Sequence, residues 1–162
     1  MKRDISEESY TRHNSLRLPG FDYSAQRAYF ITIVARDRES VFLNNPFARD
    51  VINILLKLRQ SIGFNLYAYC LMPNHFHAVI GCADSGKSLS EICGSFKSIT
   101  NRAFWKYRTG KLWQRQFYDH IIRNEQDFSE TVHYVKQNPV RKGLVENWED
   151  WEFTSRIDFL RQ

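Results

Sequence analysis

Apolar residues follow a strand-like pattern in four segments of the chain. The run YFITIVA, which starts at Tyr29, is rich in β-branched and aromatic residues and predicts a buried strand. Residues 64–71 and 75–80 predict two more strands, and the short Met72-Pro73-Asn74 connection between them favours an antiparallel hairpin. A fourth strand is predicted over residues 113–123, where polar residues interrupt the pattern.

Two further segments carry apolar residues at the three- and four-residue spacing of an amphipathic helix. The first begins at Asn44 and stops at Gly63. The second begins with Ser88 and Glu91, which have the spacing of a capping box. Each apolar stripe needs a surface to pack on, so both helices are expected to lie against the predicted strands.

A third helix is predicted over residues 125–137. It should end near Asn138, because Pro139 disfavours helical geometry in the residue before it. The resulting order, β-α-β-β-α-β-α, predicts helices packed on one antiparallel sheet, an α+β sandwich of ferredoxin-like type. Residues 1–25 are polar and turn-rich and are expected to form an N-terminal basic arm, so that residues 26–162 make up a single domain.

The charge balance favours a polyanionic partner. The 162 residues include 23 Lys and Arg against 18 Asp and Glu, which gives a formal net charge of +5 and a pI near 9.2. Aromatic residues make up 15% of the chain, and those that lie among Arg and Lys could stack on unpaired bases. Composition alone proves no nucleic-acid binding, because many basic proteins never touch DNA and most aromatic rings are core.

The sequence contains neither a membrane span nor a secretory signal. No apolar run approaches the roughly 20 residues needed to cross a bilayer, and the start MKRDISEESY lacks an apolar stretch. We therefore expect a cytoplasmic protein. Its three cysteines are odd in number and match no common zinc spacing, so they are expected to be reduced thiols.

Two histidines stand out in the third predicted strand. His75 and His77 are two residues apart, so their side chains should point to the same face of the sheet. Two imidazoles can hold one divalent ion, provided that a third ligand comes from another element and open positions remain for substrate. Taken alone, such a pair is more often structural than metal-binding.

Tyr134 and Asn138 are the candidate partners of this pair. They are four residues apart in the third predicted helix and share one helical face. An oxygen-donating Asn beside two histidines suits Mg²⁺ or Mn²⁺ and suits structural zinc much less well. The plainer alternative is that Tyr134 packs in the core while Asn138 caps the end of the helix.

Six segments of the chain, taken in order, carry a resemblance to a known family. They are SLRLPGFDYS, YFITIVARDRESVF, LMPNHFHAVI, FKSITNRAF, LWQRQFYDHIIRNEQDF and YVKQNPVRKGLV. Together they cover most of residues 15–145 and resemble the single-tyrosine HUH transposases, within them the bacterial REP-associated tyrosine transposases. The ordered set is far more specific than any one of its parts.

The resemblance assigns roles to the residues singled out above. It implies that His75 and His77 are the histidine pair of the HUH motif. It implies that Tyr134 is the nucleophile and that Asn138 is the third ligand of Mg²⁺ or Mn²⁺. Many insertion-sequence relatives have Gln four residues after the tyrosine, so Asn138 places this chain nearer the REP-associated branch. Gln137 lies one residue off that helical face and fits less well.

The resemblance also implies an activity, that of a metal-dependent single-strand DNA endonuclease and strand transferase. Tyr134 would form a 5′-phosphotyrosine link and release a 3′-hydroxyl, and a second 3′-hydroxyl could reverse the reaction and join strands. The implied partner is a folded single-strand hairpin of the REP type, within the nucleoid. No nucleotide cofactor is needed, and the seven glycines form no phosphate-binding loop pattern.

The surface expected to contact DNA is formed by the arm, the second helix and the region around the third helix. The second helix is expected to present Lys97 and Arg102 to solvent. The full set of expected DNA-binding residues is Arg12, Arg17, Lys97, Arg102, Arg115, Arg123, Arg141 and Lys142.

Tyr118 is a rival nucleophile, because it stands beside Asp119 and His120. Strand alternation puts Tyr118 and His120 on one face and Asp119 on the other, so Tyr118 is interpreted as structural or DNA-facing. His120 and His133 are expected to form hydrogen bonds rather than to bind metal.

The number of subunits stays open at this point. Insertion-sequence relatives suggest a homodimer and REP-associated ones a monomer. Aromatic residues near the C-terminus could dock on the body of the protein or cover a subunit contact; they are Trp148, Trp151, Phe153 and Phe159.

Two other functions compete with the enzyme. One is a catalytically silent nucleic-acid-binding module, which predicts salt-sensitive binding without nicking. The other is a zinc-binding regulatory domain that uses His75, His77 and a cysteine. Neither accounts for the paired Tyr134 and Asn138.

Overall fold

One antiparallel sheet organises the protein, and the computed structural model describes residues 27–155. The sheet has four strands in the order β2-β3-β1-β4. The elements are β1 (Ala28–Val34), α2 (Asn45–Ile62), β2 (Asn65–Met72), β3 (His75–Gly81), α3 (Leu89–Phe104), β4 (Tyr118–Ile121) and α4 (Glu125–Arg141), with short 3-10 turns at Arg36–Arg38, Val41–Leu43 and Trp148–Asp150. This confirms the predicted element order and the α+β sandwich.

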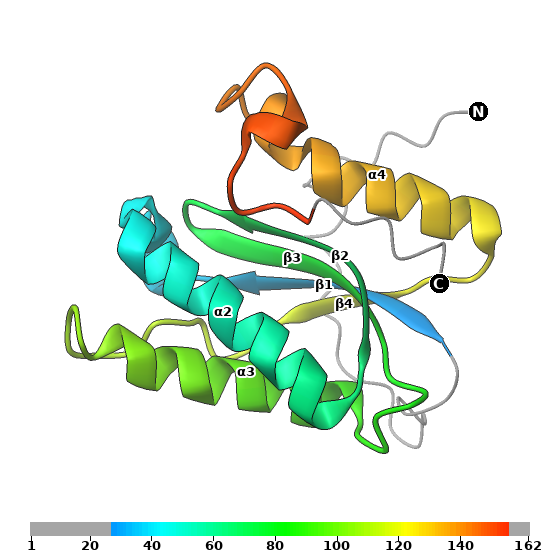
Figure 1. The fold of residues 1–162 in the computed structure, drawn as a ribbon, viewed down its shortest axis with the longest axis horizontal. Helices are drawn as coiled ribbons and strands as arrows, with labels where there is room; N and C mark the ends of the chain where they lie inside the picture. The colour runs from blue at the N-terminus through cyan, green and yellow to red at the C-terminus, as the bar shows by residue number, and fades with distance from the viewer. Residues whose placement is uncertain (1–26, 156–162) are drawn as a thin grey trace.

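The helices lie on both faces of the sheet, as Figure 1 shows. Helices α2 and α3 cover one face, where Ile31 and Ile33 of β1 join the larger apolar core. Helix α4 covers the other face, where Phe30 packs with Val132 and Val135. Alternate residues of β1 therefore enter different cores, because successive strand side chains point to opposite faces. None of the helices within the described part of the chain is long and apolar enough to span a membrane.

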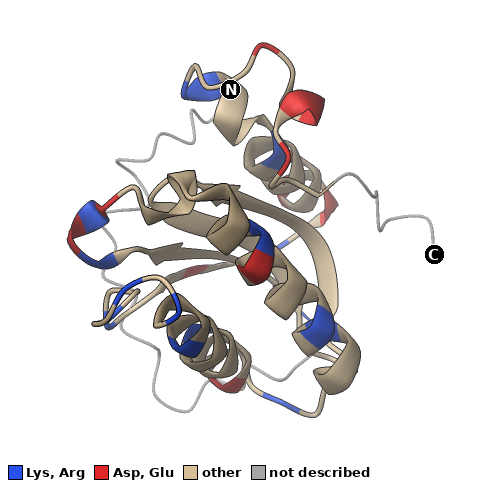
Figure 2. Ribbon diagram, turned by 60° about the vertical axis from the view of Figure 1, so that its left-hand side comes forward, with Lys and Arg blue, Asp and Glu red and all other residues tan. Residues whose placement is uncertain are grey.

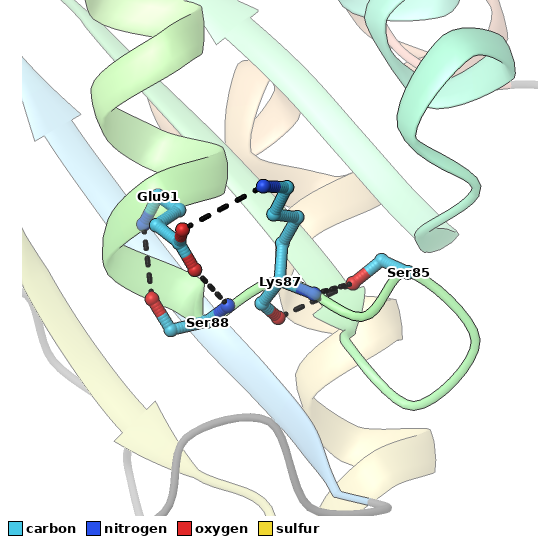
Figure 3. A network of polar contacts seen from close by, with 4 residues as sticks. All are labelled: Ser85, Lys87, Ser88 and Glu91. Atoms are coloured by element: carbon cyan, nitrogen blue, oxygen red, sulfur yellow. Dashed lines mark hydrogen bonds and ion pairs between the residues drawn. The ribbon is translucent and has the colours of Figure 1, made fainter.

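The helix ends follow the sequence signals closely. Asn44 Oδ1 accepts a hydrogen bond from the Phe47 amide at the start of α2, and Gly63 ends that helix with a φ of 85°. At the start of α3, Ser88 Oγ accepts from the Glu91 amide at 3.2 Å, and Glu91 Oε2 accepts from the Ser88 amide at 2.8 Å (Figure 3). The predicted capping box is confirmed.

The fourth strand is much shorter than predicted. β4 comprises only Tyr118–Ile121, and Trp113 makes a single isolated bridge to Ala35. Between the bridge and β4, the Lys97 ammonium donates to the carbonyls of Gln114 and Arg115 at 2.7 and 2.8 Å.

The prediction that α4 ends near Asn138 is wrong, because the helix runs through Pro139 to Arg141. Proline has no N–H to donate to the Val135 carbonyl, but in the last turn this removes only one helical bond. The Pro139 ring is buried, and the Lys142 amide still donates to the Asn138 carbonyl at 3.0 Å.

The C-terminal aromatic segment docks on the body, which was one of the two alternatives. The Leu71 amide donates to the Phe153 carbonyl at 2.8 Å, and the Ser155 amide donates to the Tyr69 carbonyl at 2.9 Å. Trp151 Nε1 also donates to the Leu71 carbonyl. This segment thereby covers the outer edge of β2, an edge that would otherwise be open to pairing with another chain. Phe159 lies outside the described residues.

Candidate active site

Strand β3 and helix α4 bring the histidine pair and the predicted nucleophile together on one face of the sheet. The ring centroids of His75 and His77 are 4.5 Å apart. The Tyr134 ring lies 6.0 Å from that of His77. Phe30 of β1 contacts both, stacking on His77 at 5.3 Å and meeting Tyr134 edge-on at 5.9 Å. All four side chains belong to one chain.

The Nδ1 atom of each histidine lies within hydrogen-bonding distance of a side-chain oxygen. Asn74 Oδ1 lies 2.6 Å from His75 Nδ1, and because a carbonyl oxygen can only accept, His75 Nδ1 is the donor. Thr32 Oγ1 lies 2.9 Å from His77 Nδ1, across the paired strands β1 and β3. Metal-binding histidines have this arrangement, in which one ring nitrogen contacts an oxygen and the other holds the ion.

The second nitrogen of each histidine points into the interior. Both Nε2 atoms are buried, and that of His77 has no hydrogen-bond partner among the described residues. Burial lowers the pKa of His77 well below its usual range, and His75, Lys142 and Arg141 lower it further. His77 is therefore neutral at physiological pH, which is the form of imidazole that binds metal.

Asn138 presents a buried amide on the same face of α4 as Tyr134. Its side chain is 1% exposed, and neither Oδ1 nor Nδ2 has a hydrogen-bond partner within the described part of the chain. The helix continues past Asn138, so the side chain does not cap the helix end. An unsatisfied buried amide costs about 1–3 kcal/mol, and Asn138 is therefore suited to a ligand that would satisfy it.

Two basic residues at the end of α4 lie close to the histidines and the tyrosine. The Arg141 guanidinium sits 4.6 Å from the centroid of the Tyr134 ring, a cation–π contact. Both Arg141 and Lys142 are exposed, and their positive charges reach His77. A phosphate group that approached this face would meet both charges before it reached the histidines.

The residues around the rival nucleophile lie as strand alternation predicts. Tyr118 is opposite Thr32 and His120 is opposite Phe30, so both face α4, whereas Asp119 is opposite Ile31 and faces the other way. His120 Nε2 lies 3.3 Å from Asp127 Oδ2, which confirms that His120 forms a hydrogen bond. His133 is exposed on α4.

Residues 27–155 offer no third ligand for a zinc site built on His75 and His77. No group of three His, Cys, Asp or Glu side chains in that range is placed to hold a metal ion. Cys70 neighbours His77 across the paired strands, but its thiol contacts the Met72 sulfur, and burial raises its pKa to about 12.

The expected DNA-binding residues fall into separate groups, and Figure 2 shows Lys and Arg on several elements of the fold. Arg141 and Lys142 lie beside the histidines, as described above, and Arg123 is exposed just before α4. Lys97, Arg102 and Arg115 line one concavity beside the end of α3. Arg12 and Arg17 lie outside the described residues.

The expectation that Lys97 is available to solvent is wrong. Its ammonium is half-buried and donates to two backbone carbonyls, and burial lowers its pKa. Lys97 therefore supplies positive charge to the concavity without having all of its hydrogen-bonding capacity free for a phosphate.

Sequence patterns missed the residues that orient the histidines. Thr32 and Asn74 hold the two Nδ1 atoms, yet Thr32 is 45 positions away from His77 in the chain. Only the register between β1 and β3 reveals that contact, because Thr32 and His77 are directly opposite one another. Asn74 could have been noticed as the residue immediately before His75.

Comparison with known proteins gives a consistent result. The family described as Transposase IS200 like matches residues 24–138. A REP-associated tyrosine transposase of Escherichia coli (strain K12) is 25% identical over 127 residues, which cover 78% of this chain and 74% of the relative. A Haemophilus influenzae protein, named as a candidate REP-associated tyrosine transposase, is 27% identical over 149 residues, with 83% and 82% covered.

A solved structure shares the same fold. It is a REP-associated tyrosine transposase bound to a REP hairpin, and it superposes with a TM-score of 0.72 at 24% identity. The superposition covers 84% of this chain and 78% of that one. The resemblance inferred from the ordered sequence motifs is thus confirmed.

Proposed function

Because this chain belongs to the IS200-like transposase family, we propose that it cleaves and rejoins single-stranded DNA through Tyr134. Membership of a transposase family implies a DNA-cleaving enzyme. The observation that carries the finer proposal is the meeting of three features on one face of the sheet. These are the Nε2 atoms of a histidine pair, the unsatisfied amide of Asn138, and the ring of Tyr134 beside His77.

The three candidate ligands fit a divalent cation such as Mg²⁺ or Mn²⁺. His75 and His77 would each offer Nε2, and Asn138 would offer Oδ1, and each of these atoms is buried. Such a cation, when bound, polarises a scissile phosphate and stabilises the charge that develops in the transition state. Two nitrogen ligands and one oxygen ligand leave coordination positions open for phosphate oxygens.

Tyr134 would act as the nucleophile in the strand-cleavage step. Its oxygen would bond to the phosphorus while the bond from phosphorus to the 3′ oxygen of the departing strand breaks. The proton lost by the phenol balances the one gained by the new 3′-hydroxyl. Deprotonating a phenol of pKa about 10 at neutral pH costs roughly 4 kcal/mol, which the groups around the reacting phosphate must offset.

The same chemistry explains strand joining. The product keeps one phosphodiester, now attached to Tyr134, so little bond energy is lost. Attack by a second 3′-hydroxyl on that phosphorus would release the tyrosine and seal the strand. The residues required for both directions belong to one chain, so a monomer would suffice for each step.

The proposed substrate is a single-stranded DNA hairpin, as in the related structure bound to a REP hairpin. Arg141 and Lys142 would attract its backbone to the histidine face. Residues 1–25 would act as a basic arm on the domain formed by residues 26–162, with Arg12 and Arg17 adding phosphate contacts. The enzyme would work on nucleoid DNA in the cytoplasm.

The direct test is trapping of the covalent adduct. Purified wild-type protein would be incubated with labelled hairpin DNA from the flanks of its gene, with Mn²⁺ or Mg²⁺ or with chelator, and run on a denaturing gel. We expect a protein–DNA band with wild type plus metal and none in chelator. Tyr134→Phe and the double variant His75→Ala/His77→Ala should also give no band.

Tyr118→Phe is the matched control, because Tyr118 faces the same side of the sheet. It should form the adduct as wild type does. An adduct that persists in Tyr134→Phe would overturn the assignment of the nucleophile. Salt-sensitive binding without any adduct would favour the silent binding module.

A further inference from the structure

A concavity of about 780 Å³ lies beside the C-terminal end of α3, away from the histidine pair. Its wall includes the indole of Trp105, which is 57% exposed. Of the exposed large hydrophobic side chains among the described residues, Trp105 is the one that lines this concavity, where basic side chains surround it. The ring is held in place, because Trp105 Nε1 donates to the Gly110 carbonyl at 2.9 Å. A flat ring with its polar atom already satisfied is suited to stacking.

The loop that carries this ring is fixed from several sides. Arg108 pairs with Glu39 at 2.6 Å, and its guanidinium lies 5.3 Å from the centroid of Phe104. Asn101 Oδ1 accepts a hydrogen bond from the Leu112 amide at 2.8 Å. These contacts join the loop to α3 and to the turn before α2. The concavity is therefore formed before any ligand arrives, which lowers the entropic cost of binding.

The concavity carries positive charge. Lys97, Arg102, Lys111 and Arg115 contribute to its wall, and of the described residues that line it, none is acidic. Arg102, Lys111 and Arg115 are exposed and able to reach a ligand. An aromatic platform surrounded by basic side chains is the arrangement by which proteins bind single-stranded nucleic acid.

We propose that this concavity binds one unpaired base of the DNA substrate, stacked on Trp105, with the adjoining phosphates held by Arg102, Lys111 and Arg115. The proposal rests on the proposed function for the identity of the polymer. It adds a site on the opposite side of the sheet from α4, with its own contribution to affinity.

The backbone connects this concavity to the catalytic end of the sheet. Trp113 bridges Ala35, and the Gln114 amide donates to the Val34 carbonyl at 2.9 Å. Val34 of β1 is also the pairing partner of His75 in β3, the strand on the other edge of β1. Only β1 separates the wall of the concavity from β3, a separation of about 10 Å at the usual spacing of neighbouring strands. A DNA strand that occupied both places would pass around this end of the sheet, because the concavity and the histidines lie on opposite faces.

Binding measurements in a cleavage-dead background would test this site. Tyr134→Phe protein would be titrated in chelator with a fluorescent hairpin from the gene's flanks that carries single-stranded extensions. Adding Trp105→Ala should weaken the Kd roughly tenfold, since stacking of one base on an aromatic ring supports an effect of that size. Trp105→Phe should restore most of the affinity. Tyr107→Ala, which removes an exposed ring outside the concavity, should leave the Kd unchanged.

A scan of the DNA then identifies the stacked base. Each nucleotide of the extensions is replaced in turn by an abasic one. At one position, the abasic replacement should weaken DNA binding by the background protein that retains Trp105. The same replacement should not weaken binding by the Trp105→Ala variant any further. If the background protein binds DNA while Trp105→Ala binds equally well and keeps its circular dichroism spectrum, the proposal is overturned. If the background protein binds no hairpin at all, the proposed function fails and this site fails with it.

Discussion

Phe30 and Ile31 are neighbours in β1, but their side chains enter opposite faces of the sheet with different chemistry. On the Ile31 face, under α2 and α3, the buried hydroxyl of Thr100 donates to the Phe96 carbonyl and accepts from Trp113 Nε1. The buried hydroxyl of Thr100 is thus paired with the protein itself, as is usual for buried groups.

The Phe30 face, under α4, buries polar atoms that have no hydrogen-bond partner within the described part of the chain. His77 Nε2 and both amide atoms of Asn138 have no hydrogen-bond partner among residues 27–155. Each such group costs about 1–3 kcal/mol of stability. The comparison indicates that the hydrogen bonds of Thr100 help to stabilise the fold, whereas His77 and Asn138 leave ligand atoms available at a cost in stability.

The largest expected effect is the loss of unfolding free energy in Phe76→Ala. Phe76 stands between the two histidines in the sequence, but its ring packs on Phe96 of α3 with centroids 4.9 Å apart. Truncating a buried phenylalanine typically costs about 3–5 kcal/mol. Urea denaturation should show this loss. A loss below about 1 kcal/mol would contradict the assignment of the stabilising core to that face.

A smaller effect is expected from Thr32→Val, which removes the hydroxyl that holds His77 Nδ1. Loss of such an outer partner typically weakens metal affinity by roughly 10–100-fold. Titration calorimetry with Mn²⁺ would measure it. Thr100→Val is the matched control on the other face, and it should lower stability while leaving Mn²⁺ affinity unchanged. Equal Mn²⁺ affinity in Thr32→Val and wild type would contradict the role of Thr32 in metal binding on the α4 face.

The smallest effect on stability is expected from Asn138→Leu. Replacing an unsatisfied buried amide with an apolar side chain of similar size should be neutral or should stabilise the metal-free protein by about 1 kcal/mol. The adduct with DNA should nevertheless be lost. Thermal unfolding and the adduct assay, run on the same preparation, check both parts. A clear loss of stability would mean that Asn138 has a structural role.

Local signals in the sequence were sufficient for most of the fold and for the central part of the site. The caps at Asn44, Gly63 and Ser88 are short-range chemistry, so the ends of α2 and the start of α3 could be predicted. The spacing of His75 and His77, and that of Tyr134 and Asn138, fixed which side chains share a face, and the structure brings the two pairs to the same side of the sheet.

Contacts between segments far apart in the chain could not be predicted from such local signals. β4 is short where the Lys97 side chain contacts the backbone carbonyls of Gln114 and Arg115, a contact between segments far apart in the chain. Helix α4 runs through Pro139, whose ring is buried in the folded protein. The partner of His77 depends on strand register. In each case tertiary packing outweighs the local preference.

Mapping the residue that carries DNA would test the central claim most directly. The adduct would be formed with Mn²⁺, digested with nuclease and protease, and sequenced by mass spectrometry. The proposed function predicts that the remaining nucleotide is attached to Tyr134 through its 5′-phosphate. Attachment to Tyr118, or to any residue off the α4 face, would contradict it.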